Sequence, residues 1–345
     1  MKGRGVSVIF SVTHFVAALA AAFVMSEVAA SFVELFWLYL VFILCSYCLQ
    51  PVLGFLADAV NRNTLMASSG CVFISLSYFL RNPLNVAFCC GVGTAAFLVG
   101  SGLDVINTSD KKLSLLSLYL APDMIGFCCG ILMHNHDMMK PLVPSMILFF
   151  LAVFDLFISS LNRREFRSGN AGLSFETITD HRTLFSVLAL YIAALLLPML
   201  VIRQAMVLGT NLSSMTIGSV LYMTGKVLGG LFSDRLGVKK VALTAACFSG
   251  TCSIIAVATH SVGFAYAGIF AAAMLVPVIV WTATRLMAGT KGLALGLVNA
   301  LTGASILIMA AGGVTLGALV MAALVAAVAV FVIIAVNRTE HTMKQ

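Results

Sequence analysis

The chain carries the stretch GLFSDRLGVKK at residues 230–240 and a shorter relative of it, GFLADAVNR, at residues 54–62. In both stretches an aspartate follows a glycine by four positions, and the two aspartates, Asp58 and Asp234, lie 176 positions apart. That separation is close to half of the 345 residues, so each half of the chain holds one copy at an equivalent place. The repeat predicts a fold that is built from two similar halves.

The composition describes the surroundings of both stretches. Charged residues make up 10% of the chain and hydrophobic residues 61%, with a mean hydropathy of +1.07. A soluble domain carries about a quarter charged residues, so water is not the main solvent of this chain. Apolar segments of roughly 17–25 residues, long enough to cross a bilayer, recur throughout. They are continuous and do not alternate with polar residues, which excludes a barrel and predicts an all-helical integral membrane protein.

Hydropathy predicts twelve membrane-spanning helices, which we number one to twelve in chain order. They are expected at 6–25, 31–56, 64–81, 84–104, 113–134, 140–161, 184–204, 213–233, 239–259, 262–283, 290–310 and 313–336. A long polar stretch at 162–183 is expected to link an N-terminal bundle, residues 1–161, to a C-terminal bundle, residues 184–345.

The basic residues predict the orientation of these helices. An even number of helices places both termini on one side, and sixteen of the 20 Lys and Arg residues then fall in segments on that same side. Because basic residues collect in cytoplasmic loops, we expect a multi-pass protein of the cytoplasmic membrane with both termini in the cytoplasm.

The repeated stretch resembles the loop signature of the major facilitator superfamily, G-x-L-x-D-R-x-G-R-[RK]. The second copy matches it at Gly230, Asp234, Arg235, Gly237 and Lys239. The first copy keeps Gly54, Asp58 and Arg62, with alanine and asparagine at positions 59 and 61 where arginine and glycine are usual.

This resemblance implies twelve transmembrane helices in two pseudo-symmetric six-helix bundles. It further implies a monomeric secondary active transporter that works by alternating access, with proton coupling and a cavity lined by helices one, four, seven and ten. In that family the two loops are taken to latch the halves together. The lining helices are largely apolar, so a small amphiphilic or hydrophobic substrate is expected.

Ionisable residues inside the membrane are candidate coupling or substrate groups, because each costs at least about 2.5–3.5 kcal/mol to bury there. Asp123 follows a proline in helix five, and Lys226 lies in the middle of helix eight. The resemblance places these helices opposite each other, so the two residues are expected to pair in one state and separate in another. The alternative is that Lys226 reaches inward along the helix and Asp123 caps the kinked backbone. His14, in helix one, is a candidate proton carrier or substrate donor, or else a packed core histidine.

Three further charged residues lie nearer to the ends of predicted helices. Arg203 could attract an anion at the outer end of helix seven, or anchor that helix at the interface. Asp155 and Glu34 are weaker candidates, since both could reach the water of the lipid headgroups.

Two short patterns bear on the direction of transport. LAPDMIG at 120–126, followed by Gly130, resembles the Gly/Pro motif of drug–proton antiporters, and it favours export. FLVGSG at 97–102 resembles the F-H-x-G-x-G of fosmidomycin-resistance-like members, with Leu98 in place of the histidine. The antiporter arginine of helix four is absent, since the span from Leu84 to Leu103 contains no charge. An uptake symporter of a small organic anion is the alternative.

A membrane enzyme and a scaffold are the rival classes. His134, His136 and Asp137 could ligate a metal, but no H-E-x-x-H or G-x-S-x-G motif accompanies them, so we expect no enzyme, metal or cofactor. A receptor or scaffold would need a soluble domain, and no polar segment is long enough to fold alone. The net charge of +7 lies in short loops and not in an aromatic-laced patch, so nucleic acid is not an expected partner.

Overall fold

The computed structural model describes residues 3–109, 112–161, 173–175, 180–209, 211–312 and 318–342, and every regular element within them is a helix. The first half holds α1 (Gly3–Ser31), α2 (Leu35–Ile43), the π-helix η1 (Leu44–Cys48), α3 (Gln50–Val60), α4 (Asn63–Ser77), α5 (Pro83–Thr108), α6 (Leu113–Leu120), α7 (Asp123–Asn135) and α8 (Leu142–Leu161). The second half holds α10 (His181–Leu208), α11 (Leu212–Leu236), α12 (Val238–Thr259), α13 (Val262–Leu286), the 3₁₀-helix η3 (Ala288–Thr290), α14 (Lys291–Gly312) and α15 (Ala318–Thr342). Most of the expected linker at 162–183 lies outside the described residues.

Ten helical segments in the described part of the chain are long and apolar enough to cross a membrane. Two expected spans fall short of that standard. The span expected at 64–81 is the 15-residue α4, and the span expected at 313–336 lies in α15, whose apolar part is Ala323–Thr339. Apolar side chains remain exposed on the outer faces, for example Phe150 at 66% and Phe185 at 59%, as lipid-facing surfaces require.

Two of the expected helices are interrupted. The second is built from α2, η1 and α3, so one turn of π-helix lies in its middle. The fifth is broken between α6 and α7 at Pro122, because proline has no N–H to donate and its ring clashes with the preceding turn. π-turns and broken helices often mark functional positions in helical proteins.

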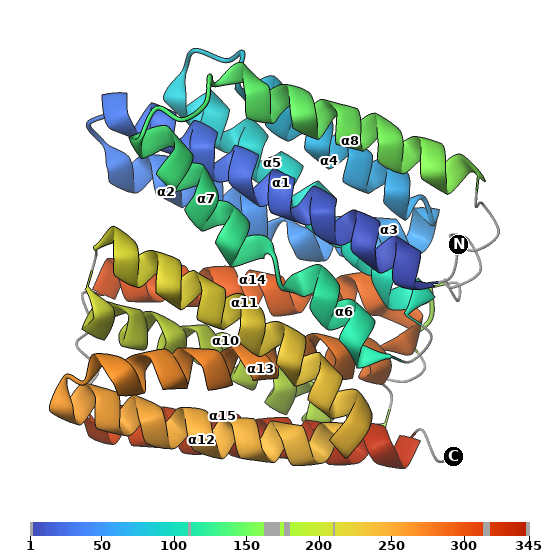
Figure 1. Cartoon of the computed structure of the whole chain (residues 1–345). Coiled ribbons are helices and arrows are strands. Elements are labelled where there is room, and N and C mark those ends of the chain that lie inside the picture. Colours follow the sequence, from blue (N-terminus) through green and yellow to red (C-terminus); the bar gives the residue numbers. More distant parts are fainter. Residues whose placement is uncertain are drawn as a thin grey trace.

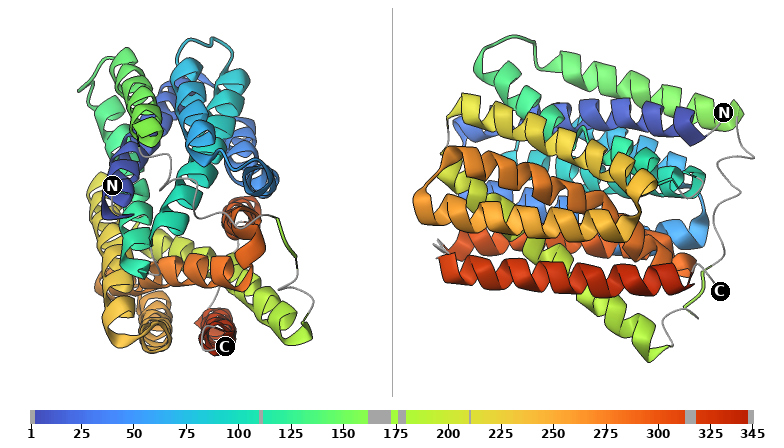
Figure 2. Two further views of the ribbon diagram at one scale, coloured as in Figure 1. Left: turned by 90° about the vertical axis from the view of Figure 1, so that its right-hand side faces the viewer. Right: turned by 60° about the horizontal axis from the view of Figure 1, so that its bottom comes forward.

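The helices form two groups in space (Figure 1). Elements α1 to α8 lie in the upper group and α10 to α15 in the lower one, and the left view in Figure 2 shows the same separation. α1 begins and α15 ends at the same end of the helices (Figure 1). The main contacts between the groups are those of α3 and η1 with α14 and of α11 with α6 and α7.

Candidate functional site

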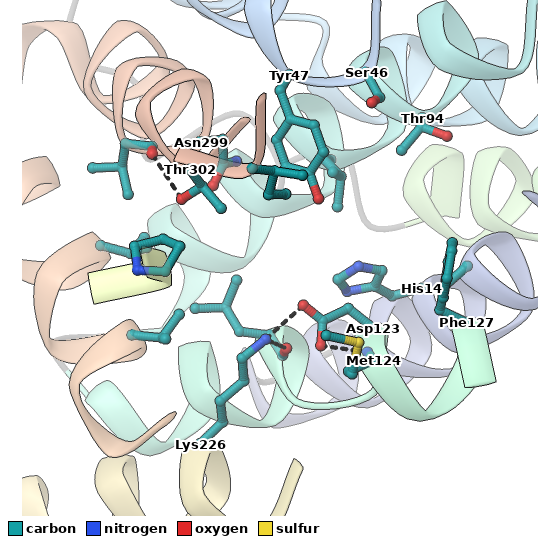
Figure 3. A pocket seen from close by; sticks show the side chains of 18 of the residues that line it. His14, Ser46, Tyr47, Thr94, Asp123, Met124, Phe127, Lys226, Asn299 and Thr302 are labelled. Atoms are coloured by element: carbon teal, nitrogen blue, oxygen red, sulfur yellow. Dashed lines mark hydrogen bonds and ion pairs between the residues drawn. The ribbon is translucent and has the colours of Figure 1, made fainter. Parts of the chain in front are cut away.

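A cavity of about 330 Å³ lies between the two groups of helices. Helices α1, α5, α10 and α13 contribute to its wall, and these are the four that the resemblance implied. That prediction was incomplete, because η1, α6, α7, α11 and α14 contribute as well and carry most of the polar groups. The polar lining residues are His14, Ser46, Tyr47, Thr94, Tyr119, Asp123, Tyr222, Lys226, Asn299 and Thr302. Figure 3 shows eight of them with labels, all but Tyr119 and Tyr222.

An ion pair crosses the cavity wall between the two halves. Lys226 Nζ lies 2.5 Å from Asp123 Oδ2 and donates to Leu120 O at 2.9 Å. It also lies 4.6 Å from the centre of the Tyr222 ring, a cation–π distance. The lysine side chain is 2% exposed and the aspartate side chain 38%. The structure therefore brings the two predicted residues together, and their separation in a second state stays a prediction.

The helix break at Pro122 makes the Leu120 carbonyl and the Asp123 carboxylate available to this lysine. In an unbroken helix the carbonyl of Leu120 would accept the N–H of Met124. Here Met124 N donates instead to Asp123 Oδ1 at 2.6 Å, and the Leu120 carbonyl accepts Lys226. The interruption thus frees one acceptor and sets the carboxylate at the N-terminus of α7, where negative charge is favoured.

His14 lies beside this pair, 4% exposed and in the cavity wall. Its Nδ1 is 2.9 Å from Tyr119 O, and its ring stacks on that of Tyr119 at 4.9 Å. A carbonyl only accepts, so Nδ1 carries a hydrogen, and in the neutral ring Nε2 is the free acceptor. The Tyr119 hydroxyl is itself held by Ser101 Oγ at 2.7 Å.

The two repeated stretches extend toward the cavity at equivalent positions. Residues four apart lie on one face of a helix, and each repeat places three such residues against the other half. We name them the α3 stripe (Gln50, Gly54, Asp58) and the α11 stripe (Lys226, Gly230, Asp234). Each residue of one stripe lies 176 positions from its counterpart in the other.

Both aspartates accept the first backbone N–H groups of a helix in the opposite half. Asp58 accepts from Gly292 N at 2.8 Å and Leu293 N at 3.0 Å, at the start of α14. Asp234 does the same at the start of α6, where Leu113 N and Ser114 N lie at 2.9 and 3.0 Å. A carboxylate at a helix N-terminus satisfies unpaired donors and interacts favourably with the helix dipole. The two caps join the halves at the end where α1 begins and α15 ends.

The glycine and the third residue of each stripe complete the contact. Gly54 and Gly292 touch backbone to backbone, so a Cβ on either would overlap the carbonyl oxygen of the other. Gly230 packs closely on α6 as well, but there a Cβ would overlap mainly the side chain of Ser117. Next to the cavity, Gln50 Oε1 accepts from Asn299 Nδ2 at 2.6 Å, at the place where the α11 stripe has its lysine.

Sequence analysis missed Gln50 and Asn299. A signal was available, because a shift of 176 positions from Lys226 leads to Gln50. An amide among apolar residues draws less attention than a charge, yet Gln50 is fully buried and has to be paired.

The remaining residues of the loop signature lie outside these contacts. Arg62, Arg235 and Lys239 are exposed. Gly237 ends α11 with a φ of +92°, a left-handed conformation that favours glycine. Their predicted role in gating stays a prediction.

Of the weaker candidates, Glu34 and Arg203 are not part of the cavity wall. Glu34 is exposed at the start of α2, and Arg203 is half-buried near the end of α10.

The interpretation of Asp155 as a group that reaches headgroup water was wrong. Asp155 is 2% exposed and accepts from Thr13 Oγ1 at 3.3 Å, because this face of α8 packs on α1. The statement that helix four contains no charge was likewise wrong, because Asp104, the last residue of the span expected at 84–104, lies inside α5, which continues to Thr108. Asp104 is 1% exposed and accepts from Thr64 Oγ1 at 2.5 Å.

His134, His136 and Asp137, which were considered as metal ligands and set aside, do not form a cluster of three ligands in the described residues. His134 Nδ1 lies 3.2 Å from Glu27 Oε2, and the described residues contain no group of three His, Cys, Asp or Glu side chains that could hold a metal ion. The glycines of the antiporter-like motif, Gly126 and Gly130, let α7 pack closely on α1.

Comparison with known proteins identifies the fold. No protein-family profile and no curated protein matches the sequence. Among solved structures, the chain is similar to the human organic anion transporter MFSD10, with a TM-score of 0.70 and 13% identity over 96% of this chain and 99% of that one. It is also similar to the E. coli fucose:proton symporter FucP, with a TM-score of 0.65 and 12% identity over 95% and 97% of the two chains. FucP in the outward conformation gives a TM-score of 0.65, 13% identity and coverage of 95% and 98%.

These likenesses extend over nearly the whole chain. The protein therefore has the fold of the major facilitator transporters, and it is a multi-pass helical membrane protein.

Proposed function

We propose that this chain is a secondary active transporter that moves a small amphiphilic molecule across the membrane by alternating access. The observation that supports this best is a central cavity between the halves, together with two equivalent contacts between them, the helix caps by Asp58 and Asp234. Such contacts can form and break as units when one half rocks against the other. The wall of the cavity is mostly apolar with a few polar groups, which suits an amphiphilic molecule.

In this proposal the chain has twelve transmembrane helices in two six-helix bundles, residues 1–161 and 184–345, joined by a linker at 162–183. The ten long apolar segments, α4 and α15 supply the twelve. Exposed Arg62, Arg235 and Lys239 lie at the end that holds the two caps, which supports a cytoplasmic position for that end and for both termini. We expect a monomer in the cytoplasmic membrane.

Proton coupling is part of the proposal, because three ionisable groups meet in the cavity wall. His14, Asp123 and Lys226 lie where a substrate would bind, so a proton and a substrate can influence each other there. Export is favoured by the antiporter-like pattern around Pro122. Uptake of a small organic anion is the second candidate, and it is favoured by the cationic Lys226 in the wall.

Transport in proteoliposomes under an imposed pH gradient tests this function. Candidate compounds are first selected by their effect on the thermal stability of the purified protein, since a ligand stabilises the state that it binds. We expect flux of a selected compound that reverses with the sign of the pH gradient and stops with a protonophore. Lys226→Met should abolish the flux, and Glu34→Gln, an exposed charge outside the cavity, should leave it unchanged. Compounds that bind tightly but never cross the membrane would contradict the proposal.

A further inference from the structure

The two members of the cavity ion pair differ sharply in their exposure. The side chain of Lys226 is 2% exposed, and its Nζ contacts Leu120 O, Asp123 Oδ2 and the Tyr222 ring. The side chain of Asp123 is 38% exposed and borders the open cavity. The lysine is therefore fixed in the wall, while the carboxylate can be reached from the cavity.

A buried ammonium group has to keep a counter-charge, because an unpaired charge in a low-dielectric environment is costly. Asp123 can move away from Lys226 only if another anion takes its place. When the pair separates, Asp123 keeps the hydrogen bond from Met124 N to its Oδ1 at the start of α7. Lys226 keeps only the neutral Leu120 carbonyl and the Tyr222 ring, and neither supplies a counter-charge. Release from Lys226 thus leaves Asp123 stabilised by the helix dipole, and it leaves Lys226 open to a new partner.

We propose that Lys226 is an anion-binding site whose resident counter-ion is Asp123, and that the transported substrate carries a carboxylate or a similar anionic group that replaces Asp123. This inference rests on the proposed transport function and names its substrate class. The apolar body of the substrate lies against apolar side chains of the cavity wall, among them Leu197, Pro198, Val276, Ile279, Val298 and Ile306. A cavity of about 330 Å³ has room for a small carboxylic acid of this kind.

The other titratable groups in the described wall do not offer a second binding site for an anion. They are His14 from α1, Tyr47 from η1, Tyr119 from α6 and Tyr222 from α11. Lys226 is the only lysine or arginine in the described lining. His14 Nδ1 is bonded to the Tyr119 carbonyl, and in the neutral ring Nε2 is an acceptor, which does not bind an anion.

Three probes with the same body and different head groups test the site: 4-phenylbutanoate, 4-phenylbutan-1-ol and 4-phenylbutan-1-amine. Binding to the purified full-length protein in detergent is measured by calorimetry and by thermal unfolding at pH 6. We expect 4-phenylbutanoate to bind and to raise the Tm, and the alcohol and the amine to do neither. Equal binding of the alcohol or the amine would overturn the anion site.

Two variants should change the affinity for 4-phenylbutanoate in opposite directions. Asp123→Asn removes the competing charge and should lower the Kd of 4-phenylbutanoate at least about tenfold, since close charge pairs are worth more than 1.4 kcal/mol. Lys226→Met should abolish binding, and Glu34→Gln should bind as the wild type does. If Lys226→Met does not fold, the Asp123→Asn result decides alone. No binding of the carboxylate to either wild type or Asp123→Asn would overturn the proposal.

The same probes separate this inference from the transport function. Flux of the alcohol or the amine without any preference for the carboxylate would leave transport standing and overturn the anion site. Specific binding of 4-phenylbutanoate without flux of any compound would leave the site standing and contradict transport.

Discussion

The α3 and α11 stripes make the same contact with opposite distributions of charge. Each has a helix-capping aspartate at one end, a glycine in the middle and a polar side chain at the cavity. In the α3 stripe the cavity residue is a neutral amide and the aspartate is buried, at 7% exposed. In the α11 stripe the cavity residue is a buried lysine and the aspartate is exposed.

The copy that matches the loop signature better is therefore not the copy that makes the stronger contact. The second copy of the signature is the better match, yet its aspartate faces water, which can replace it as a partner of the helix N-terminus. The first copy is degraded, but its aspartate is the one that water cannot easily replace. We infer that the Asp58 cap holds the halves together more strongly than the Asp234 cap does, and that the α11 stripe contributes the chemistry through Lys226.

The largest effect should come from removing the counter-ion of the buried lysine. Asp123→Ala leaves Lys226 unpaired at 2% exposure and should lower the free energy of unfolding by up to about 3–5 kcal/mol. Asn299→Ala, the equivalent change on the α3 side, leaves only a neutral amide oxygen unpaired and should cost about 1–3 kcal/mol. Thermal and denaturant unfolding in detergent measure both. Lys226→Met is the matched control, and it should cost less than Asp123→Ala because Asp123 keeps its bond to Met124.

Equal losses for Asp123→Ala and Asn299→Ala would contradict the distinction between a charged and a neutral contact.

Substitution of the stripe glycines by alanine should give the next largest loss of stability. A second substitution should restore stability for only one of the two glycines. An alanine at Gly54 meets the backbone of Gly292, which cannot move without separating α3 from α14. An alanine at Gly230 meets mainly the side chain of Ser117. Each substitution should cost about 1–3 kcal/mol, and Ser117→Gly should restore part of the stability of Gly230→Ala only. Unfolding measurements on the two single variants and on both combined with Ser117→Gly decide this, and rescue of Gly54→Ala would count against it.

Much of the fold could be predicted because bilayer thickness and hydropathy restrict a chain of this composition to spanning helices. The repeat at 176 positions located both caps, since a loop with glycine and aspartate at fixed spacing is visible in the sequence alone. The interruption at Pro122 follows from the chemistry of proline.

Other features depend on packing that no local pattern contains. Asp155 was placed at the headgroups because a helix sequence does not state which face meets α1. Asp104 was left out although it is the last residue of the span expected at 84–104. Hydropathy places helix ends within a few residues at best, so it does not show that α5 continues one turn beyond this carboxylate. Gln50 and Asn299 carry no charge, so only the contact between the halves reveals that they are paired.

The capping aspartates should give a smaller effect with a local signature. Asp58→Ala and Asp234→Ala each remove a helix cap, which is typically worth about 0.5–2 kcal/mol, and the buried Asp58 should lie at the upper end. Hydrogen exchange measured by mass spectrometry should show faster exchange at Gly292 and Leu293 in the first variant. In the second, the segment that begins at Leu113 should change less, because water already reaches that cap. The reverse order would show that completeness of the signature, and not burial, sets the strength of the cap.

A third aspartate cap, at Asp180, lies within one half of the chain and serves as a control for the two caps between the halves. Asp180 precedes α10, where it accepts from Thr183 Oγ1 at 2.9 Å and from Arg338 Nη2 at 2.5 Å, both in the same half of the chain. The hydrogen bond from the Thr183 hydroxyl, followed by those from the backbone N–H groups and the charge of Arg338, lowers the pKa of Asp180 below its usual 3.8. A carboxyl group with a lowered pKa in the folded state stabilises the fold above its unfolded pKa, and this contribution is lost as the pH falls through the folded value. Asp180→Asn should therefore be slightly less stable than the wild type at pH 7 and should match it well below pH 3.8, which is the smallest effect of the series because the group is exposed.

Hydrogen exchange of Asp180→Asn at Gly292 and Leu113 should equal that of the wild type, since neither cap between the halves is touched. Faster exchange there would mean that a cap within one half also controls the contact between the halves, and the comparison of the two stripes would have to include it.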